Sequence, residues 1–244
     1  MSRNKLAIMV HGGWHGSWCW DRVMPQMQKL GFTEVLTPDL PGHGKNLAKF
    51  KDITLDSYVK SISSLVETAK YPVVLIGHSM AGVVISQVAE KHHSKISTLI
   101  YISGFVPDND GCLVDEEKKA KHPSVALEIK VDEDEACISL DGSKKLRELF
   151  YNCTRTEDVD YALSHLQKQP LFPFLNRVHL TTKNFGSVKK LYIECLQDNA
   201  IHIEDQRRMN SKIDCEIVTI NTDHSPFFSA QDELLGIIES TLLE

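Results

Sequence analysis

Residues 73–87 read VVLIGHSMAGVVISQ, and this stretch decides the fold. The run Val73–Ile76 is rich in β-branched residues and predicts a strand buried on both faces. The apolar positions from Met80 to about Glu90 predict a helix, and Ser79 stands at the apex of the turn between the two. A strand, a sharp turn and a helix with Ser at the apex form the context of a nucleophile elbow. Ala81 takes the second glycine position of the G-x-S-x-G motif, which is a small departure because Ala is also small.

The alternative is that Ser79 is an ordinary serine in a helix-capping turn. The flanking residues favour the nucleophile. Only small residues stand at Gly77, Ala81 and Gly82, which predicts that strand and helix approach each other closely there. The free amides at the start of such a helix, together with its dipole, favour an anion beside the serine.

Length and composition indicate a single α/β domain or a domain with an insertion. The chain has 244 residues, of which 42% are hydrophobic and 25% charged, as in ordinary globular proteins. A net charge of −6 argues against a nucleic-acid partner. No apolar run is long enough for a membrane span, and residues 6–10 are too short a run for a signal-peptide core. The charged run 116–119 is expected to be a solvated surface segment.

The six cysteines, at positions 19, 112, 137, 153, 195 and 215, are widely spaced and include no C-x-x-C pair. This pattern suits reduced thiols, so we expect a cytoplasmic protein without disulfides.

Strands and helices alternate on both sides of a region with a different pattern. This predicts a mostly parallel sheet with helices on both faces, built from residues 1–105 and 187–244. Strands are expected at 6–10, 34–37, 73–77, 95–102, 187–194 and 215–220, and helices at 21–30, 55–70, 80–90, 203–210 and 231–243.

Residues 106–186 interrupt this alternation and are expected to form an inserted cap. The region carries a charged run at 132–135, a turn at 141–142, and helical patterns at 143–151 and 156–166. The segment 171–175, LFPFL, is apolar and stiffened by proline. It either roofs a small pocket over the nucleophile or only holds the cap to the sheet.

A glycine-rich loop, HGGWHGSWCW, occupies residues 11–20 after the first expected strand. Glycines at this place allow the backbone to approach a ligand with its N–H groups free to donate. The tryptophans could instead only fill the core. We favour the ligand role, because the elbow needs a second amide for an oxyanion hole. We predict that this hole consists of the backbone N–H of Met80 and one from the His11–Gly13 loop.

A serine nucleophile needs a base and a group that orients the base, and in this fold they follow in the order Ser, acid, His. Asp198 and His224 each come just after an expected strand, at the edge of the sheet where sites form. His78 and Asp223 adjoin Ser79 and His224 and cannot reach them well. Asp39 also ends a strand, but we expect it to anchor its own loop.

No cofactor or metal site is predicted. The sequence has no H-E-x-x-H motif and no Cys/His set at ligand spacing, and no G-x-G-x-x-G follows the first expected strand.

These motifs resemble the α/β-hydrolase family, in particular the branch of plant methylesterases, hydroxynitrile lyases and their microbial relatives. The resemblance rests on the loop 11–20, residues 77–82 and 105–108, Asp198 and residues 206–208 and 223–224, and residues 38–44 look more like those of the microbial members. It covers nearly the whole chain and is weakest in the cap.

The resemblance implies that Ser79, Asp198 and His224 form the catalytic triad. It further implies that Gly13 and Met80 donate the oxyanion-hole amides and that Gly12 and Phe105 lie at the substrate. Relatives are often homodimers, which makes a homodimer an expectation here. Two departures bear on the activity. Hydroxynitrile lyases of this branch carry Lys after the catalytic His and Thr in the first loop, where this chain has Ser225 and Gly12.

Without the ammonium group no charge stabilises departing cyanide, so the sequence favours a serine carboxylesterase acting on small esters. A hydroxynitrile lyase-type carbon–carbon lyase and a ligand-binding protein on the same fold are the alternatives. An intact Ser, Asp and His argues against a pure binder.

Overall fold

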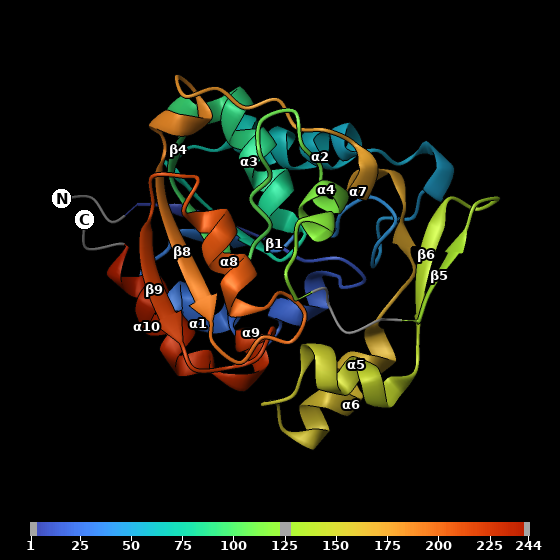
Figure 1. Cartoon of the computed structure of the whole chain (residues 1–244). Helices are drawn as coiled ribbons and strands as arrows, with labels where there is room; N and C mark the ends of the chain where they lie inside the picture. The colour runs from blue at the N-terminus through green and yellow to red at the C-terminus, as the bar shows by residue number, and fades with distance from the viewer. Residues whose placement is uncertain (1–3, 123–127, 242–244) are drawn as a thin grey trace.

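A six-stranded parallel sheet forms the centre of the molecule (Figure 1). The structure is a computed structural model that describes residues 4–122 and 128–241. The strand order is β2-β1-β3-β4-β8-β9, and every neighbouring pair is parallel. The strands are β1 (Leu6–Val10), β2 (Glu34–Leu36), β3 (Val73–His78), β4 (Ile96–Ile102), β8 (Lys189–Cys195) and β9 (Glu216–Ile220). The predicted α/β-hydrolase sheet and its strands are therefore confirmed.

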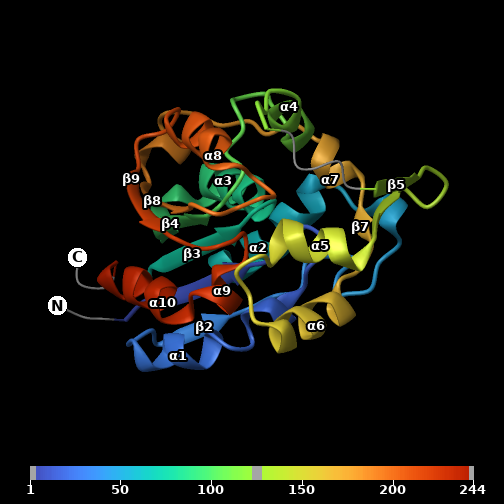
Figure 2. The same ribbon diagram turned by 60° about the horizontal axis from the view of Figure 1, so that its bottom comes forward.

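Helices cover both faces of this sheet (Figure 2). Alternate strand residues point to opposite faces, so Ile8 and Leu75 join one buried cluster while Met9 and Ile76 join another. Helices α2 (Leu55–Thr68), α3 (Ala81–His92) and α8 (Ile203–Asn210) pack on the first face. Helices α1 (Met24–Lys29), α9 (Pro226–Ser229) and α10 (Gln231–Ser240) pack on the second.

The first helix is shorter than the sequence pattern predicts. We expected a helix from residue 21, but Ser17–Trp20 forms a separate 3-10 turn and α1 begins at Met24. Pro25 explains the start, because proline has no N–H to donate and fits only in the first turn of a helix.

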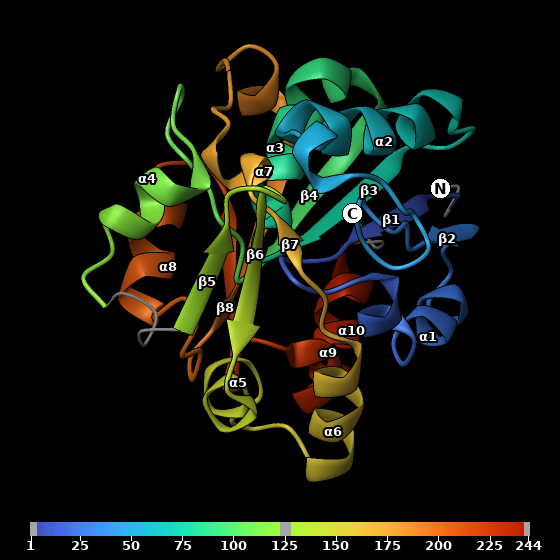
Figure 3. The same ribbon diagram turned by 90° about the vertical axis from the view of Figure 1, so that its right-hand side faces the viewer.

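Between β4 and β8 the chain forms a smaller structure beside the central sheet (Figure 3). Its elements are α4 (Leu113–Lys118), β5 (Glu128–Asp132), β6 (Cys137–Asp141), α5 (Ser143–Phe150), α6 (Thr156–His165), β7 (Gln169–Pro170) and α7 (Phe172–Leu175). Strands β5, β6 and β7 make an antiparallel sheet, with a turn at residues 133–136 between β5 and β6. Sequence analysis predicted helices near α5 and α6 but not this hairpin, whose turn overlaps the charged run 132–135.

The expectation that residues 116–119 form a solvated run is wrong for Glu116. Its side chain is fully buried and pairs with Arg208, Lys212 and Lys119. These contacts tie α4 to α8 and its C-terminal end. Among the described residues, no helix is both long and apolar enough to cross a membrane.

Candidate active site

Ser79 lies at a sharp turn between β3 and α3. Its backbone φ is +52°, a conformation that non-glycine residues rarely adopt. The turn is held by its own backbone: Ser79 N–H donates to the carbonyl of Ile102 at 3.1 Å, and its carbonyl accepts from the amides of Gly82 and Phe105, each at 3.0 Å. The elbow is thus anchored to the neighbouring strand β4 and to the segment that follows it.

The small residues around the elbow are required by the close approach of strand and helix. A Cβ on Gly82 would come within 2.3 Å of the Phe105 carbonyl oxygen, and one on Gly77 within 2.9 Å of the Ala81 carbonyl oxygen. A larger residue at either place would push α3 away from the sheet.

Asp198 and His224 meet beyond the ends of β8 and β9. Asp198 Oδ2 and His224 Nδ1 are 2.7 Å apart, and both residues are almost completely buried. The other oxygen of Asp198, Oδ1, accepts from the amides of Ala200 and Ile201 at 2.7 and 2.8 Å. These bonds fix the carboxyl group in place, so that its Oδ2 orients the imidazole ring.

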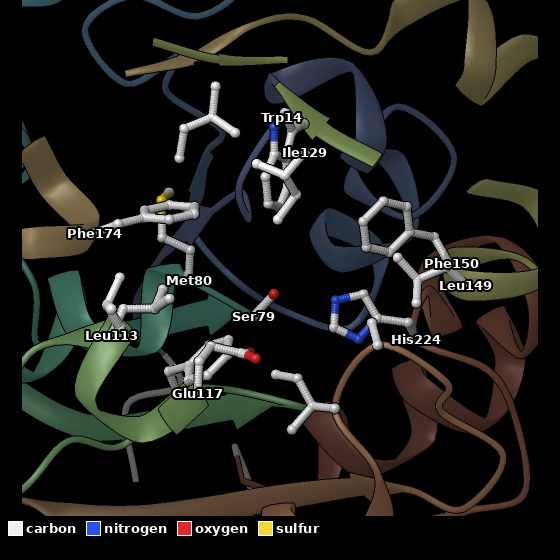
Figure 4. Close-up of a pocket in the computed structure, with 15 residues that line it drawn as sticks. Trp14, Ser79, Met80, Leu113, Glu117, Ile129, Leu149, Phe150, Phe174 and His224 are labelled. Atoms are coloured by element: carbon white, nitrogen blue, oxygen red, sulfur yellow. The ribbon is translucent and has the colours of Figure 1, made fainter. Parts of the chain in front are cut away.

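Ser79 and His224 face each other across a cavity (Figure 4). No hydrogen bond joins the Ser79 hydroxyl to the imidazole in this structure. Such contacts are often long in ligand-free enzymes and tighten when substrate binds. The sequence-predicted residues Ser79, Asp198 and His224 thus lie together at the carboxyl edge of the sheet.

Buried histidines lie near His224: the His78 ring is 4.5 Å from it between centroids, and His15 also acts on it electrostatically. His78 donates from Nε2 to the carbonyl oxygen of His224 at 2.8 Å. Burial lowers the pKa of His15 to about 3 and that of His11 to about 4, and it also holds the pKa of His78 well below the usual value. These rings therefore add no positive charge beside His224 near neutral pH.

The two predicted oxyanion-hole amides are those of Gly13 and Met80. Neither donates a hydrogen bond to any described residue, so both are available to a ligand. Gly12 does not line the cavity but packs beneath the nucleophile: a Cβ there would lie 2.8 Å from His78 Nδ1 and 3.0 Å from Ser79 Cβ. Its absent side chain leaves room for the elbow.

The cavity over Ser79 has a volume of about 250 Å³ and is largely apolar. Phe105, predicted at the substrate, lines it. From the segment 171–175 only Phe174 reaches it. The lining residues are Trp14, Ser79, Met80, Phe105, Leu113, Val114, Glu117, Ile129, Ile138, Leu149, Phe150, Phe174, Ala200, Ile201 and His224.

Comparison with family models matches residues 7–237 to the alpha/beta hydrolase family. The chain belongs to the α/β-hydrolase family. Methylesterase 9 of Arabidopsis thaliana is 30% identical over 249 residues, which cover 94% of this hydrolase and 95% of the relative. Putative methylesterase 11, chloroplastic, from the same plant is 32% identical, but the hydrolase spans only 61% of its length.

Solved structures share the same fold with lower identity. Polyneuridine aldehyde esterase has a TM-score of 0.86 and 23% identity, covering 98% of this hydrolase and 99% of that chain. A pyrethroid hydrolase from Sphingobium faniae JZ-2 has a TM-score of 0.87 and 24% identity. The match covers 98% of this hydrolase and 97% of that chain. At this identity the likeness establishes the fold.

Asp39 and Asp223, the two carboxylates considered beside Asp198 in the sequence, stabilise loops of the hydrolase. Asp39 accepts from the amides of Ser17 and Lys45 at 2.7 and 2.9 Å, and so anchors two loops. Asp223 accepts from the amide of Cys153 at 2.8 Å and that of Ser225 at 3.0 Å.

Two polar residues at Asp198 Oδ2 were missed as site residues. Ser103 donates from Oγ at 2.7 Å, and Gln206 donates from Nε2 at 3.3 Å. Ser103 carried a usable signal, since it is the first residue after the buried strand β4 and so lies at the same edge as Ser79. Gln206 contributes from helix α8, and no local pattern directs it to Asp198.

The described residues include one group of metal-binding types, Asp132, Glu135 and Cys137 on the β5–β6 hairpin. Asp132 Oδ1 already accepts from the amide of Glu135 at 2.9 Å, and Glu135 pairs with Lys168 at 2.6 Å. We assign no site to this group, because one oxygen of each carboxylate is already engaged within the hydrolase and both carboxylates are exposed.

Proposed function

We propose that this α/β hydrolase is a serine carboxylesterase that cleaves small carboxylic esters. The observation that carries the proposal is the 2.7 Å hydrogen bond between Asp198 Oδ2 and His224 Nδ1, with Ser79 facing the same imidazole. An ionised Asp198 holds the proton on Nδ1 and leaves the lone pair of Nε2 free to act as a base. The names of the methylesterase and esterase relatives agree with this activity.

In the proposed reaction, Ser79 Oγ attacks the ester carbonyl carbon while His224 Nε2 takes its proton. The carbonyl oxygen becomes an oxyanion, which the amides of Gly13 and Met80 stabilise. Collapse of this intermediate breaks the bond to the alcohol, and His224 returns the proton to the leaving oxygen. Water, deprotonated by His224, then attacks the acyl carbon; the bond to Ser79 Oγ breaks, His224 returns the proton to that oxygen, and the acid is released.

The segment 106–186 is proposed to act as the cap of this site. It supplies Leu113 and Phe174 to the cavity wall, so its position over Ser79 would set the size of the accepted ester. A cytoplasmic location remains a proposal consistent with six free thiols.

The test is hydrolysis of p-nitrophenyl acetate by wild type, Ser79→Ala and the exposed control Ser64→Ala. We expect Ser79→Ala to lose nearly all turnover and Ser64→Ala to retain it. A fluorophosphonate probe should add one adduct per chain, located on Ser79 by mass spectrometry. Turnover by Ser79→Ala at the wild-type rate would refute the assignment.

The lyase alternative is tested with the same proteins. The lysine position of the lyases holds Ser225, whose buried hydroxyl has no partner among the described residues. We therefore expect no cyanide release from mandelonitrile. Release that disappears in His224→Ala would establish the lyase instead.

A further inference from the structure

Glu117 places a carboxyl group in the wall of an otherwise largely apolar cavity. It lies on α4, and its side chain points into the space below Ser79 and beside His224 (Figure 4). Among the described lining residues it is the one with a carboxyl group. The undescribed residues 123–127, Pro-Ser-Val-Ala-Leu, contain no charged type.

This carboxyl group has no hydrogen-bond or ion-pair partner among the described residues. The adjacent Glu116 takes the nearby cations instead, with Arg208, Lys212 and Lys119 all within ion-pair distance. Asp205 on α8 shares Arg208, at 3.2 Å. Glu117 thus places a carboxyl group in the cavity wall with no cation from the described residues beside it to neutralise its ionised form.

The charged and titratable groups that act on Glu117 come from two other elements. Helix α8 contributes Asp205 and Arg208, and the loop after β9 contributes His224. Burial, followed by the negative charge of Asp205, raises the pKa of Glu117 to about 7, and Arg208 and His224 oppose the rise. An ionised carboxylate in such surroundings is costly unless it is paired.

We propose that Glu117 is a specificity-determining residue that selects esters carrying a cationic group, which it pairs within the cavity over Ser79. This inference rests on the proposed esterase function for its substrate class, but not for the binding of the cation. An alcohol hydroxyl would donate a hydrogen bond yet leave the negative charge unneutralised, and a substrate carboxylate would be repelled. A cation is the ligand that removes the cost of the buried charge.

Linkage gives the size of the expected effect. A cation that lowers the pKa of Glu117 by one unit binds about tenfold more tightly to the ionised form than to the protonated form. Cation preference should therefore be low below pH 6 and rise through pH 7, and Glu117→Gln should lack this rise.

The experiment compares wild type, Glu117→Gln and the exposed control Glu34→Gln on two isosteric substrate pairs. Acetylcholine and 3,3-dimethylbutyl acetate differ only in charge on the alcohol side. The p-nitrophenyl esters of β-alanine and butyric acid place the charge on the acyl side. For each protein, kcat/KM for the cationic ester is divided by kcat/KM for its neutral partner. Dividing the ratio of each variant by the ratio of wild type then cancels the intrinsic reactivity of the esters.

We expect Glu117→Gln to reduce this ratio at pH 8 by about tenfold or more for at least one pair, with Glu34→Gln unchanged. Equal ratios in wild type and Glu117→Gln for both pairs would overturn the inference. Calorimetry with choline and 3,3-dimethylbutanol separates the two proposals. Choline binding that depends on Glu117 without any ester turnover would refute the esterase and support the cation site, whereas turnover of the neutral esters without charge selection would do the reverse.

Discussion

Replacing Asp198 with Asn tests the orientation of the proposed base, and the structure allows the result to be worked out atom by atom. Asp198 Oδ1 accepts from two backbone amides, at 2.7 and 2.8 Å, which cannot change their polarity. Oδ2 accepts from Ser103, His224 and Gln206. An amide group has one acceptor and one donor end, so it cannot replace both oxygens.

The Asn side chain could take two orientations. If its carbonyl faced Ser103 and His224, its NH₂ group would face the amides of Ala200 and Ile201, which are donors, and both hydrogen bonds from those amides would be lost. The opposite orientation keeps those amides paired and presents NH₂ to His224 Nδ1. The imidazole must then carry its proton on Nε2, where it cannot accept the proton of Ser79. We therefore expect kcat to fall by about 10⁴-fold, as for loss of the correct tautomer in other triads. The free energy of unfolding should fall by about 1–3 kcal/mol.

The assay is steady-state hydrolysis of p-nitrophenyl acetate, with thermal unfolding measured on the same samples. Asp39→Asn is the matched control, because Asp39 also accepts from two backbone amides at 2.7 and 2.9 Å beyond the end of a strand. It should lower the melting temperature but reduce kcat less than about tenfold. Retention of more than about a tenth of kcat by Asp198→Asn would refute the proposed role.

Three further outcomes are expected. Ser103→Ala removes the 2.7 Å bond to Asp198 Oδ2 and should lower kcat more than it raises KM; a change in KM alone would contradict a positioning role. For p-nitrophenyl esters, kcat/KM should rise by about fourfold per methylene over the first acyl carbons and then drop, whereas a rate still rising at long chains would indicate an open groove. Glu117→Gln should raise the free energy of unfolding on the order of 1–3 kcal/mol at pH 8. The carboxyl pKa rises from 4.5, its usual value, to about 7 in the folded protein, so the wild type loses stability as the pH rises between these two values and the Gln variant does not. Unfolding curves at pH 4 and pH 8 should show that this gain vanishes in acid, and equal gains at both would contradict the unpaired charge.

The central sheet could be predicted from the sequence because its strands are buried on both faces. The run Val73–Ile76 is apolar throughout, and in Leu99–Ile102 the Tyr101 hydroxyl is the one polar group, so both are easily recognised as buried strands. Parallel strands also bring their carboxyl ends to one edge, so residues far apart in the chain could be placed together. This reasoning put Ser79, Asp198 and His224 in one site without any knowledge of helix packing.

The hairpin β5–β6 could not be recognised in the same way. The register pairs Ile129 with Leu140 and Val131 with Ile138 on one face, from which Ile129 and Ile138 line the cavity. Ile129 and Val131 nevertheless stay about half exposed, so this face is not a continuous buried run of the kind that marks the central strands. The strands are five residues each and end in a charged turn. Their pairing depends on packing beside the central sheet, which a local pattern does not contain.

The contrast between Glu116 and Glu117 marks the limit of local sequence patterns. Adjacent residues on a helix point about 100° apart, so one faces α8 and the other faces the cavity. Composition gives both the same expectation, a solvated carboxylate. Only the orientation of α4 decides that Glu116 is buried among Arg208, Lys212 and Lys119 while Glu117, beside the nucleophile, has no partner in the described part of the chain. Substrate selectivity in this hydrolase would therefore depend on how the segment 106–186 packs, whereas the meeting of Ser79, Asp198 and His224 follows from the order of the parallel strands that precede them.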